Sequence, residues 1–248
     1  MMRKSRLEVR SRRGAWAASL CFLTATAARS QSVAVGANPY LTMAPVSQYM
    51  IANRTEEIGL ARSAAPASIA DHAEVLVLGA RGYETAVNGT NGFVCFVGRS
   101  WDVNFADPQF WNPKIRTPQC DNATSARSVL PRYLARTKRV LTSASKAEMR
   151  KLETADWAAG KLKAPEPGAL CYMMSKGAYL NDDGGAWRPH VMFFAPRTAD
   201  GAWGANLPGS PVMSDSSSYE QTTIFFVVVP NWSDGTSGSP VKAGASND

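Results

Sequence analysis

Short apolar runs alternate with polar, glycine-rich stretches along most of this 248-residue chain. Runs rich in valine, phenylalanine and other strand-forming residues predict strands over 74–79, 83–87, 93–97, 169–180, 186–195 and 222–229. The Asn-Gly turn between 83–87 and 93–97 predicts that these two runs pair as a hairpin. A turn at 181–185 predicts a second hairpin, and the uninterrupted run 222–229 indicates a central strand.

Apolar positions at helical spacing predict helices over about 45–65, 122–141 and 145–160. Asp121 or Asn122 can cap the second helix, and Pro131 either kinks it or opens a further helix. Ser145-Lys146-Ala147-Glu148 is a capping box, which marks the start of the third helix. The aromatic, proline-rich stretch 101–120 has no period, so it is expected to be an ordered loop.

The order of these elements indicates the fold class. The strands come in hairpins and the helices lie between them, which favours α+β over alternating βαβ units. We therefore expect one globular domain over 31–232. Its mainly antiparallel sheet should have about five to seven strands, packed against about two to four helices. The stretch 233–248 is small and polar, and it predicts a disordered tail.

The first thirty residues follow the layout of a secretory signal peptide. Basic side chains fill 1–14, an uncharged stretch runs from Ala15 to Ala28, and cleavage is expected after Ala27, Ala28 or Ser30. Arg12-Arg13 resembles a twin-arginine signal, so that route stays open beside the general secretory route. The apolar stretch is shorter than the roughly 20 residues that a membrane span requires. We expect a periplasmic or secreted protein without an integral membrane span.

The leader also explains most of the formal net charge of +7. Residues 1–28 hold six basic side chains and one acidic side chain, a net of +5, which leaves +2 on the rest of the chain. A nearly neutral domain lacks the electrostatic footprint of a nucleic-acid-binding protein, so no such partner is expected. The basic stripe at Arg132, Arg136 and Arg139 is expected to be a solvated helix face.

Five strings between 57 and 234 are specific enough to serve as a label. They are Leu-Ala-Arg-Ser-Ala-Ala-Pro (60–66), Gly-Phe-Val-Cys (92–95), Phe-Trp-Asn-Pro-Lys (110–114), Pro-His-Val-Met-Phe-Phe (189–194) and Trp-Gly-Ala-Asn-Leu-Pro-Gly-Ser-Pro (203–211). Over this region the chain resembles a family of uncharacterised bacterial exported proteins. That family has no assigned activity, ligand or catalytic residue, so the resemblance implies a bacterial exported protein and no mechanism.

Three cysteines follow the leader: Cys95 and Cys171 in apolar strands, and Cys120 ahead of a helix. In an oxidising compartment two of them are expected to form a disulfide. Cys120 is the loop residue and therefore the expected bridging member. Cys95 is the preferred partner, and Cys171 is the alternative.

A second hypothesis makes Cys120 a nucleophile, since a helix N-terminus lowers a thiol pKa, with His190 as its base. The order of the two residues resembles the layout of the NlpC/P60 peptidoglycan hydrolases. A third hypothesis concerns soft ligand types that suit copper(I), although methionine and cysteine in strands usually fill cores. These residues are Cys171, Met173, Met174, His190 and Met192. No ligand spacing marks a metal site, so neither a metal nor another cofactor is expected.

Three tryptophans stand in loops: Trp101, Trp111 and Trp203. Such rings can line a pocket for a sugar or another small ligand, or they can pin a loop onto the domain. No residue pattern identifies a reaction. We therefore expect an exported bacterial protein that serves as a binding or structural module of the cell envelope, with an envelope polysaccharide or a small ligand as its partner. The alternative is a thiol-dependent hydrolase that acts on cell-wall material.

Overall fold

The computed structural model describes residues 39–182, 187–198, 201–216 and 221–238. All of them belong to one unit, Asn38–Asp248. The leader expected over 1–30 and the tail from 239 onward lie outside the described residues. In the part of the chain that is described, no helix has the length and apolar character needed to cross a membrane.

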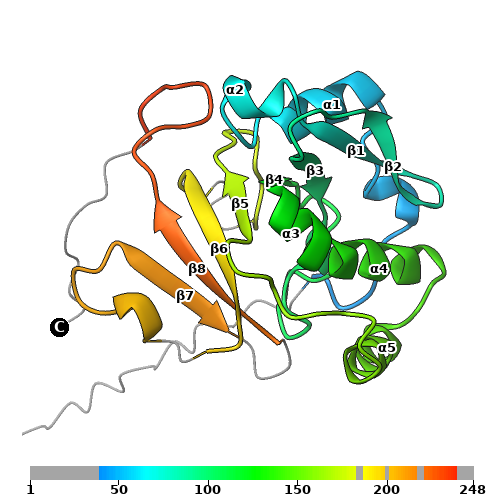
Figure 1. Ribbon diagram of the computed structural model, residues 1–248. Coiled ribbons are helices and arrows are strands. Elements are labelled where there is room, and N and C mark those ends of the chain that lie inside the picture. Colours follow the sequence, from blue (N-terminus) through cyan, green and yellow to red (C-terminus); the bar gives the residue numbers. More distant parts are fainter. Residues whose placement is uncertain (1–38, 183–186, 199–200, 217–220, 239–248) are drawn as a thin grey trace, which may run out of the picture. The chain divides into compact units, whose positions relative to one another are not determined.

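An eight-stranded sheet organises this unit (Figure 1). Its strands are β1 (Glu74–Gly79), β2 (Gly82–Val87), β3 (Val94–Gly98), β4 (Thr117–Asp121), β5 (Leu170–Met173), β6 (His190–Pro196), β7 (Val212–Ser216) and β8 (Thr222–Val228). They lie in the order β2-β1-β3-β4-β5-β6-β8-β7. Among the described strands the pair β1–β3 is parallel and the other neighbours are antiparallel. The fold is therefore α+β with a mostly antiparallel sheet, as the sequence predicts.

Several of the helices begin at a residue whose side chain caps the first turn. They are α1 (Arg54–Arg62), α2 (Ala67–Ala70), α3 (Ala123–Ser128), α4 (Leu130–Leu141) and α5 (Lys146–Ala158), with 3-10 turns η1 (Val46–Gln48), η2 (Ser100–Asp102) and η3 (Ala202–Gly204). Asn122 caps α3 and accepts from the Ser125 backbone N–H. Pro131 lies in the first turn of α4, and Ser145 caps α5. The predicted helix over 45–65 is shorter, because its first part forms only η1.

The predicted hairpin of 83–87 with 93–97 is wrong. β2 pairs instead with β1 across a short turn that ends at Gly82, whose φ of 123° suits glycine. β3 then lies parallel to β1, starting from Glu74 opposite Val94. The glycine-rich stretch 88–92 is therefore a crossover rather than a hairpin turn.

Two strands were not predicted, and both are rich in polar residues. β4 lies in the predicted loop 101–120, and β7 follows the Gly/Pro loop around Trp203. Because β7 pairs with β8 on its outer side, β8 is next to the sheet edge rather than central. The start of the predicted tail is also ordered: the Ser233 backbone N–H donates to Met174 O at 3.0 Å.

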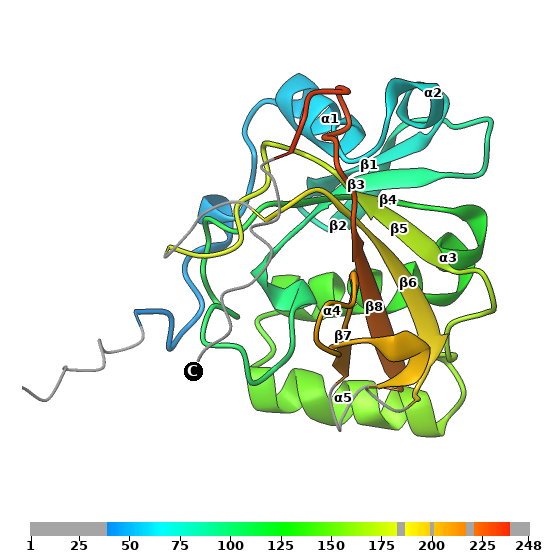
Figure 2. The same ribbon diagram turned by 90° about the vertical axis from the view of Figure 1, so that its left-hand side faces the viewer.

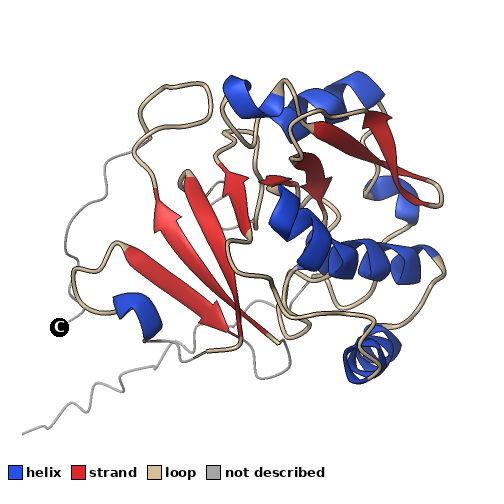
Figure 3. Ribbon diagram, in the orientation of Figure 1, coloured by secondary structure: helices blue, strands red, loops and turns tan. Residues whose placement is uncertain are grey.

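Helices cover both faces of the sheet (Figure 2). On one face, alanines of α1 and α2 pack against a cluster that includes Val75, Cys95 and Cys120. On the other face, Leu130 and Tyr133 at the start of α4 pack against β3, β5 and β6. Figure 3 shows that the α-helices gather over β1 to β5, while β6, β8 and β7 extend beyond them.

The basic stripe of α4 is not a solvated face. Arg136 is fully buried, and it holds Glu153 of α5 in a two-pronged ion pair, with Nε–Oε2 at 2.6 Å and Nη2–Oε1 at 2.8 Å. Arg132 is also buried. The prediction failed because the acidic partner comes from a helix 17 residues further along the chain, and periodicity within one helix does not reveal it.

Candidate functional site

The sulfur atoms of Cys95 and Cys120 lie 1.93 Å apart, at disulfide distance. The two residues are directly opposite in the antiparallel pair of β3 and β4. Both are buried against the alanine-rich face formed by α1 and α2. Cys171 is a buried thiol outside this pair, and burial raises its pKa well above the usual value. The expected pairing of Cys120 with Cys95 is therefore seen.

The structure removes the proposed catalytic pair of Cys120 and His190. Cys120 is opposite Tyr172, which is opposite Val191, so these three positions share one face of the sheet. His190 is the neighbour of Val191 and therefore faces the other side. The two residues also stand two strands apart, at about 4.8 Å per strand. A thiol in a disulfide, on the opposite face from the imidazole, cannot serve as its nucleophile.

The three candidate tryptophans do not come together. Trp101 is fully buried and donates from Nε1 to Thr137 Oγ1 at 2.9 Å. Trp111 is also buried, and it packs edge-on against Phe110. Trp203 is 60% exposed and stacks on Phe225 with ring centroids 4.1 Å apart. Full burial removes Trp101 as a platform for a ligand, and both Trp101 and Trp111 pin the long loop between β3 and β4. Trp111 also borders an open hollow of about 790 Å³.

The soft copper-type side chains lie on facing strands. Cys171 is opposite Met192, and Met173 is opposite His190. Cys171, Met173 and Met192 belong to an apolar cluster. In the described ranges no group of three His, Cys, Asp or Glu side chains could hold a metal ion. These sulfur atoms fill the core.

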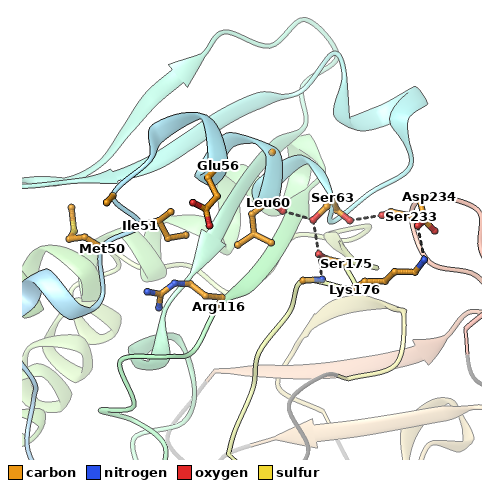
Figure 4. A pocket seen from close by; sticks show the side chains of 13 residues that line it. Met50, Ile51, Glu56, Leu60, Ser63, Arg116, Ser175, Lys176, Ser233 and Asp234 are labelled. Atoms are coloured by element: carbon orange, nitrogen blue, oxygen red, sulfur yellow. Dashed lines mark hydrogen bonds and ion pairs between the residues drawn. The ribbon is translucent and has the colours of Figure 1, made fainter.

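An open groove of about 850 Å³ runs along α1 (Figure 4). Ser63 and Ser175 share a hydrogen bond of 2.6 Å between their hydroxyls, and Ser233 Oγ donates to Ser63 O at 2.6 Å. At the groove's end, Lys176 pairs with Asp234 at 2.7 Å. These five side chains are therefore already bonded within the protein.

A smaller cavity of about 310 Å³ lies on the α4 face of the sheet. We call it the β4 cavity. Its lining comes from the loop after η2, from β4 to β8, from the start of α4 and from the β5–β6 connection. The lining residues are Asp102, Val103, Asn104, Asp107, Thr117, Gln119, Arg132, Tyr133, Met173, Leu180, Trp187, Met192, Asp215, Ile224 and Phe226. Its volume falls in the range of small-molecule sites, about 300–1,000 Å³.

Three polar side chains converge over Gly98 at one end of the β4 cavity. Thr117 Oγ1, Asp102 Oδ2 and Gln119 Nε2 each come within 3.0 Å of the place where a Cβ at position 98 would stand. Thr117 is directly opposite Gly98, and Gln119 follows it on the same face of β4. The missing side chain at Gly98 therefore leaves room for this polar cluster.

Three residues that line the cavity carry hydrogen-bonding atoms that the protein leaves unused. Thr117 Oγ1, Asp102 Oδ1 and Trp187 Nε1 are shielded from solvent and have no hydrogen-bond partner among the described residues. Thr117 is 5% exposed. The other oxygen of Asp102 accepts from the Arg99 backbone N–H at 3.1 Å. Buried polar atoms are nearly always paired in folded proteins. Three unpaired atoms on residues around one cavity therefore indicate a candidate ligand-binding site.

A perturbed pKa also marks the β4 cavity. Burial raises the pKa of Asp102 to about 7, against the pull of Arg136 and Arg132. Burial likewise raises the pKa of Asp121, at the end of β4, to about 7. Asp102 lines the cavity whereas Asp121 does not, and a perturbed carboxyl group beside a cavity marks a candidate functional site.

Sequence reasoning missed the residues of this cavity. Thr117, Gln119 and Asp121 are polar residues at the two-residue period of a strand, in a segment whose five residues are all buried, and that period was the available signal. Pro118 and the surrounding aromatic residues led to the prediction of a loop instead. The approach of Asp102 and Trp187 depends on tertiary structure, which no local pattern reveals.

Comparison with known proteins adds no family or activity to this geometry. The chain matches no protein-family model, no curated protein and no solved structure. The resemblance to uncharacterised exported proteins stays a prediction.

Proposed function

We propose that this protein is an exported saccharide-binding protein, and that its β4 cavity holds one sugar ring. The observation that carries the proposal is the set of unused buried atoms, Thr117 Oγ1, Asp102 Oδ1 and Trp187 Nε1, around one cavity. Leaving such a group buried without a partner costs about 1–3 kcal/mol. A ligand that supplies partners for these atoms recovers that free energy on binding.

The kinds of atoms favour a ligand rich in hydroxyl groups. The indole of Trp187 can only donate, an ionised Asp102 can only accept, and Thr117 can do both. An ammonium group cannot accept from Trp187, and an anion would face the carboxyl of Asp102. A hydroxyl both donates and accepts, so a neutral polyhydroxylated molecule satisfies all three.

The remaining lining supports the same class. Trp187, Tyr133 and Phe226 offer aromatic surface for the C–H faces of a sugar ring. Gln119 and Arg132 add an amide and a guanidinium, which form paired hydrogen bonds with neighbouring hydroxyls. Apolar walls with a few placed polar groups are typical of small-ligand sites.

Two features support export. The first thirty residues have the layout of a signal peptide. Cys95 and Cys120 lie at disulfide distance, and disulfides persist in oxidising compartments outside the cytoplasm. We therefore place the protein in the periplasm or the secreted fraction of a bacterium, where envelope polysaccharides supply sugars.

The test is calorimetric titration of the mature protein with D-glucose, D-galactose and N-acetyl-D-glucosamine. We expect saturable binding of at least one sugar by the wild type, and at least a tenfold loss in Thr117→Val, which removes one hydroxyl at nearly constant volume. Ser63→Ala changes the groove of Figure 4 and is the matched control; its affinity should equal that of the wild type. Absence of saturable binding for all three sugars, or equal binding by Thr117→Val, would contradict the proposal.

A further inference from the structure

A second hollow, of about 610 Å³, adjoins the β4 cavity. The two share three lining residues, Leu180, Trp187 and Phe226. We call the second one the His190 hollow. Its own lining comes from β6, β7, β8 and the loop before β7, and consists of Arg188, His190, Asn206, Met213, Ser214 and Val228. Trp187 therefore stands at the junction of two adjoining spaces.

His190 lines this hollow and carries an unpaired hydrogen-bond acceptor. Its Nδ1 lies 2.7 Å from Arg188 O, and because a carbonyl only accepts, Nδ1 carries the proton. Burial lowers the pKa of His190, so the ring stays neutral and Nε2 keeps its lone pair. Nε2 has no partner among the residues that the structure describes, although His190 is only 6% exposed.

The imidazole is also held in one orientation. Trp187 meets it edge-on, with ring centroids 4.9 Å apart and an interplanar angle of 86°. Phe226 lies on it with centroids 5.7 Å apart. Burying the Nε2 acceptor without a partner costs free energy, which filling the core alone does not require. A fixed ring with an unused acceptor is the feature expected of a binding residue.

Another polar pair in the hollow is already bonded. Asn206 Nδ2 donates to Ser214 Oγ at 2.9 Å, and the Ser214 backbone N–H donates to Asn206 Oδ1 at 3.0 Å. These contacts join the loop after η3 to β7 and stabilise that wall. Asn206 and Ser214 are therefore bonded to one another, whereas His190 Nε2 is left to accept from a ligand hydroxyl.

We infer that the His190 hollow is a second sugar subsite, so that the ligand is an oligosaccharide of at least two rings whose second ring donates a hydroxyl to His190 Nε2. This inference rests on the proposed function of the β4 cavity. Trp187 lines both spaces, so its indole would lie against the linkage between the rings. The occupied site would run from the polar cluster over Gly98 to β7.

The test compares each monosaccharide with its β-1,4-linked disaccharide: D-glucose with cellobiose, and N-acetyl-D-glucosamine with N,N′-diacetylchitobiose. In the wild type we expect the disaccharide to bind at least tenfold more tightly, as one further hydrogen bond with ring contacts provides. In His190→Phe, which keeps an aromatic ring but no acceptor, the ratio of the two dissociation constants should fall toward one. His190→Gln can donate to Arg188 O and still accept, and it should restore part of the ratio.

The outcomes separate the two proposals. A wild type that binds a monosaccharide and its disaccharide equally well overturns the second subsite and leaves the sugar site in the β4 cavity. An equal loss for both ligands in His190→Phe also overturns it, because His190 would then act only through the fold. A wild type that binds none of these ligands overturns the proposed function itself. Ser63→Ala, outside both hollows, should keep the wild-type ratio.

Discussion

The two faces of β4 differ sharply, although one strand of five residues supplies both. On one face, Cys120 joins Cys95 against the alanines of α1 and α2, and apolar contacts fill the space. On the other face, Thr117 and Gln119 border a cavity, and Thr117 Oγ1 has no partner among the described residues. Strand alternation alone separates the two environments. The closed face stabilises the fold, and the open face is where we propose that a ligand binds.

The two sides of the sheet also differ in how their buried carboxyl groups are paired. On the closed side Glu57 of α1 is paired with Arg99 at 2.8 Å and also accepts from the Leu78 backbone N–H. At the β4 cavity Asp102 has one bonded oxygen and one unused oxygen, and burial raises its pKa to about 7. Removing the charge of Glu57 should therefore destabilise the protein, whereas removing the charge of Asp102 should not.

The largest effect is expected from Glu57→Gln. Loss of the carboxylate leaves the guanidinium of Arg99 buried without a counter-charge, which costs about 3–5 kcal/mol. Urea denaturation measures the change. Glu56→Gln, the exposed neighbour in the same helix turn, is the control and should change stability by less than about 1 kcal/mol. Similar losses in both variants would remove the distinction between a buried pair and a surface charge.

The next largest loss of stability is expected from removal of the disulfide between Cys95 and Cys120. The double variant Cys95→Ala/Cys120→Ala should lose roughly 3 kcal/mol, because the disulfide closes a loop in the unfolded chain. Reductant should lower the melting temperature of the wild type and leave the double variant unchanged. Because the cross-link faces away from the cavity, sugar affinity should be kept. Without reductant, the unfolded mature protein should titrate as one thiol, Cys171; three thiols would contradict the pairing.

Asp102→Asn should have the opposite sign from Glu57→Gln. An unfolded aspartate has a pKa of about 3.9, whereas the folded value is about 7. The ionised form is therefore disfavoured in the native state, so native stability falls as pH rises from about 4 to about 7 and then levels off. Asparagine cannot ionise, so the variant should be close to the wild type near pH 4 and exceed it by about 4 kcal/mol at about pH 8.

An exposed aspartate provides the control for that pH series. Tyr179, Tyr40 and Lys114 hold the pKa of Asp182 well below its usual range. Its contribution to stability is present at neutral pH and is lost as pH falls. Asp182→Asn should therefore be less stable than the wild type near pH 7, with a difference that shrinks in acid. If both variants shift stability in the same direction, the electrostatic account of Asp102 is wrong.

The smallest expected effect compares two buried threonines. Thr137 Oγ1 accepts from Trp101 Nε1, so Thr137→Val leaves the indole unpaired and should cost about 1–3 kcal/mol. Thr117 Oγ1 has no partner in the described part of the chain, so Thr117→Val should change stability by less than about 0.5 kcal/mol or raise it. Thermal unfolding of the two variants under one condition measures the contrast. A large loss in Thr117→Val would show that its hydroxyl already has a structural partner.

The sequence predicted the helices best, because their caps are local. Asn122 and Ser145 mark helix starts that the structure confirms, and the pairing of Cys95 with Cys120 followed from their setting. Pairing between distant segments was harder to predict: β2 joins β1 rather than β3, because Gly82 permits the shorter turn. The cavity was missed since its polar residues interrupt the apolar pattern that identifies strands. Polar residues at such a candidate site depart from the apolar pattern by which a strand is recognised in a sequence.

The most direct test of a sugar site in the β4 cavity is the melting temperature of Thr117→Val and the wild type, with and without the best-binding sugar of the three named above. A ligand that binds only the native state raises the melting temperature with its concentration. Without sugar, we predict that Thr117→Val melts at the temperature of the wild type or slightly above it. With the same concentration of sugar, we predict a much larger rise in the wild type than in Thr117→Val. Equal rises in both proteins would contradict a sugar site bounded by Thr117.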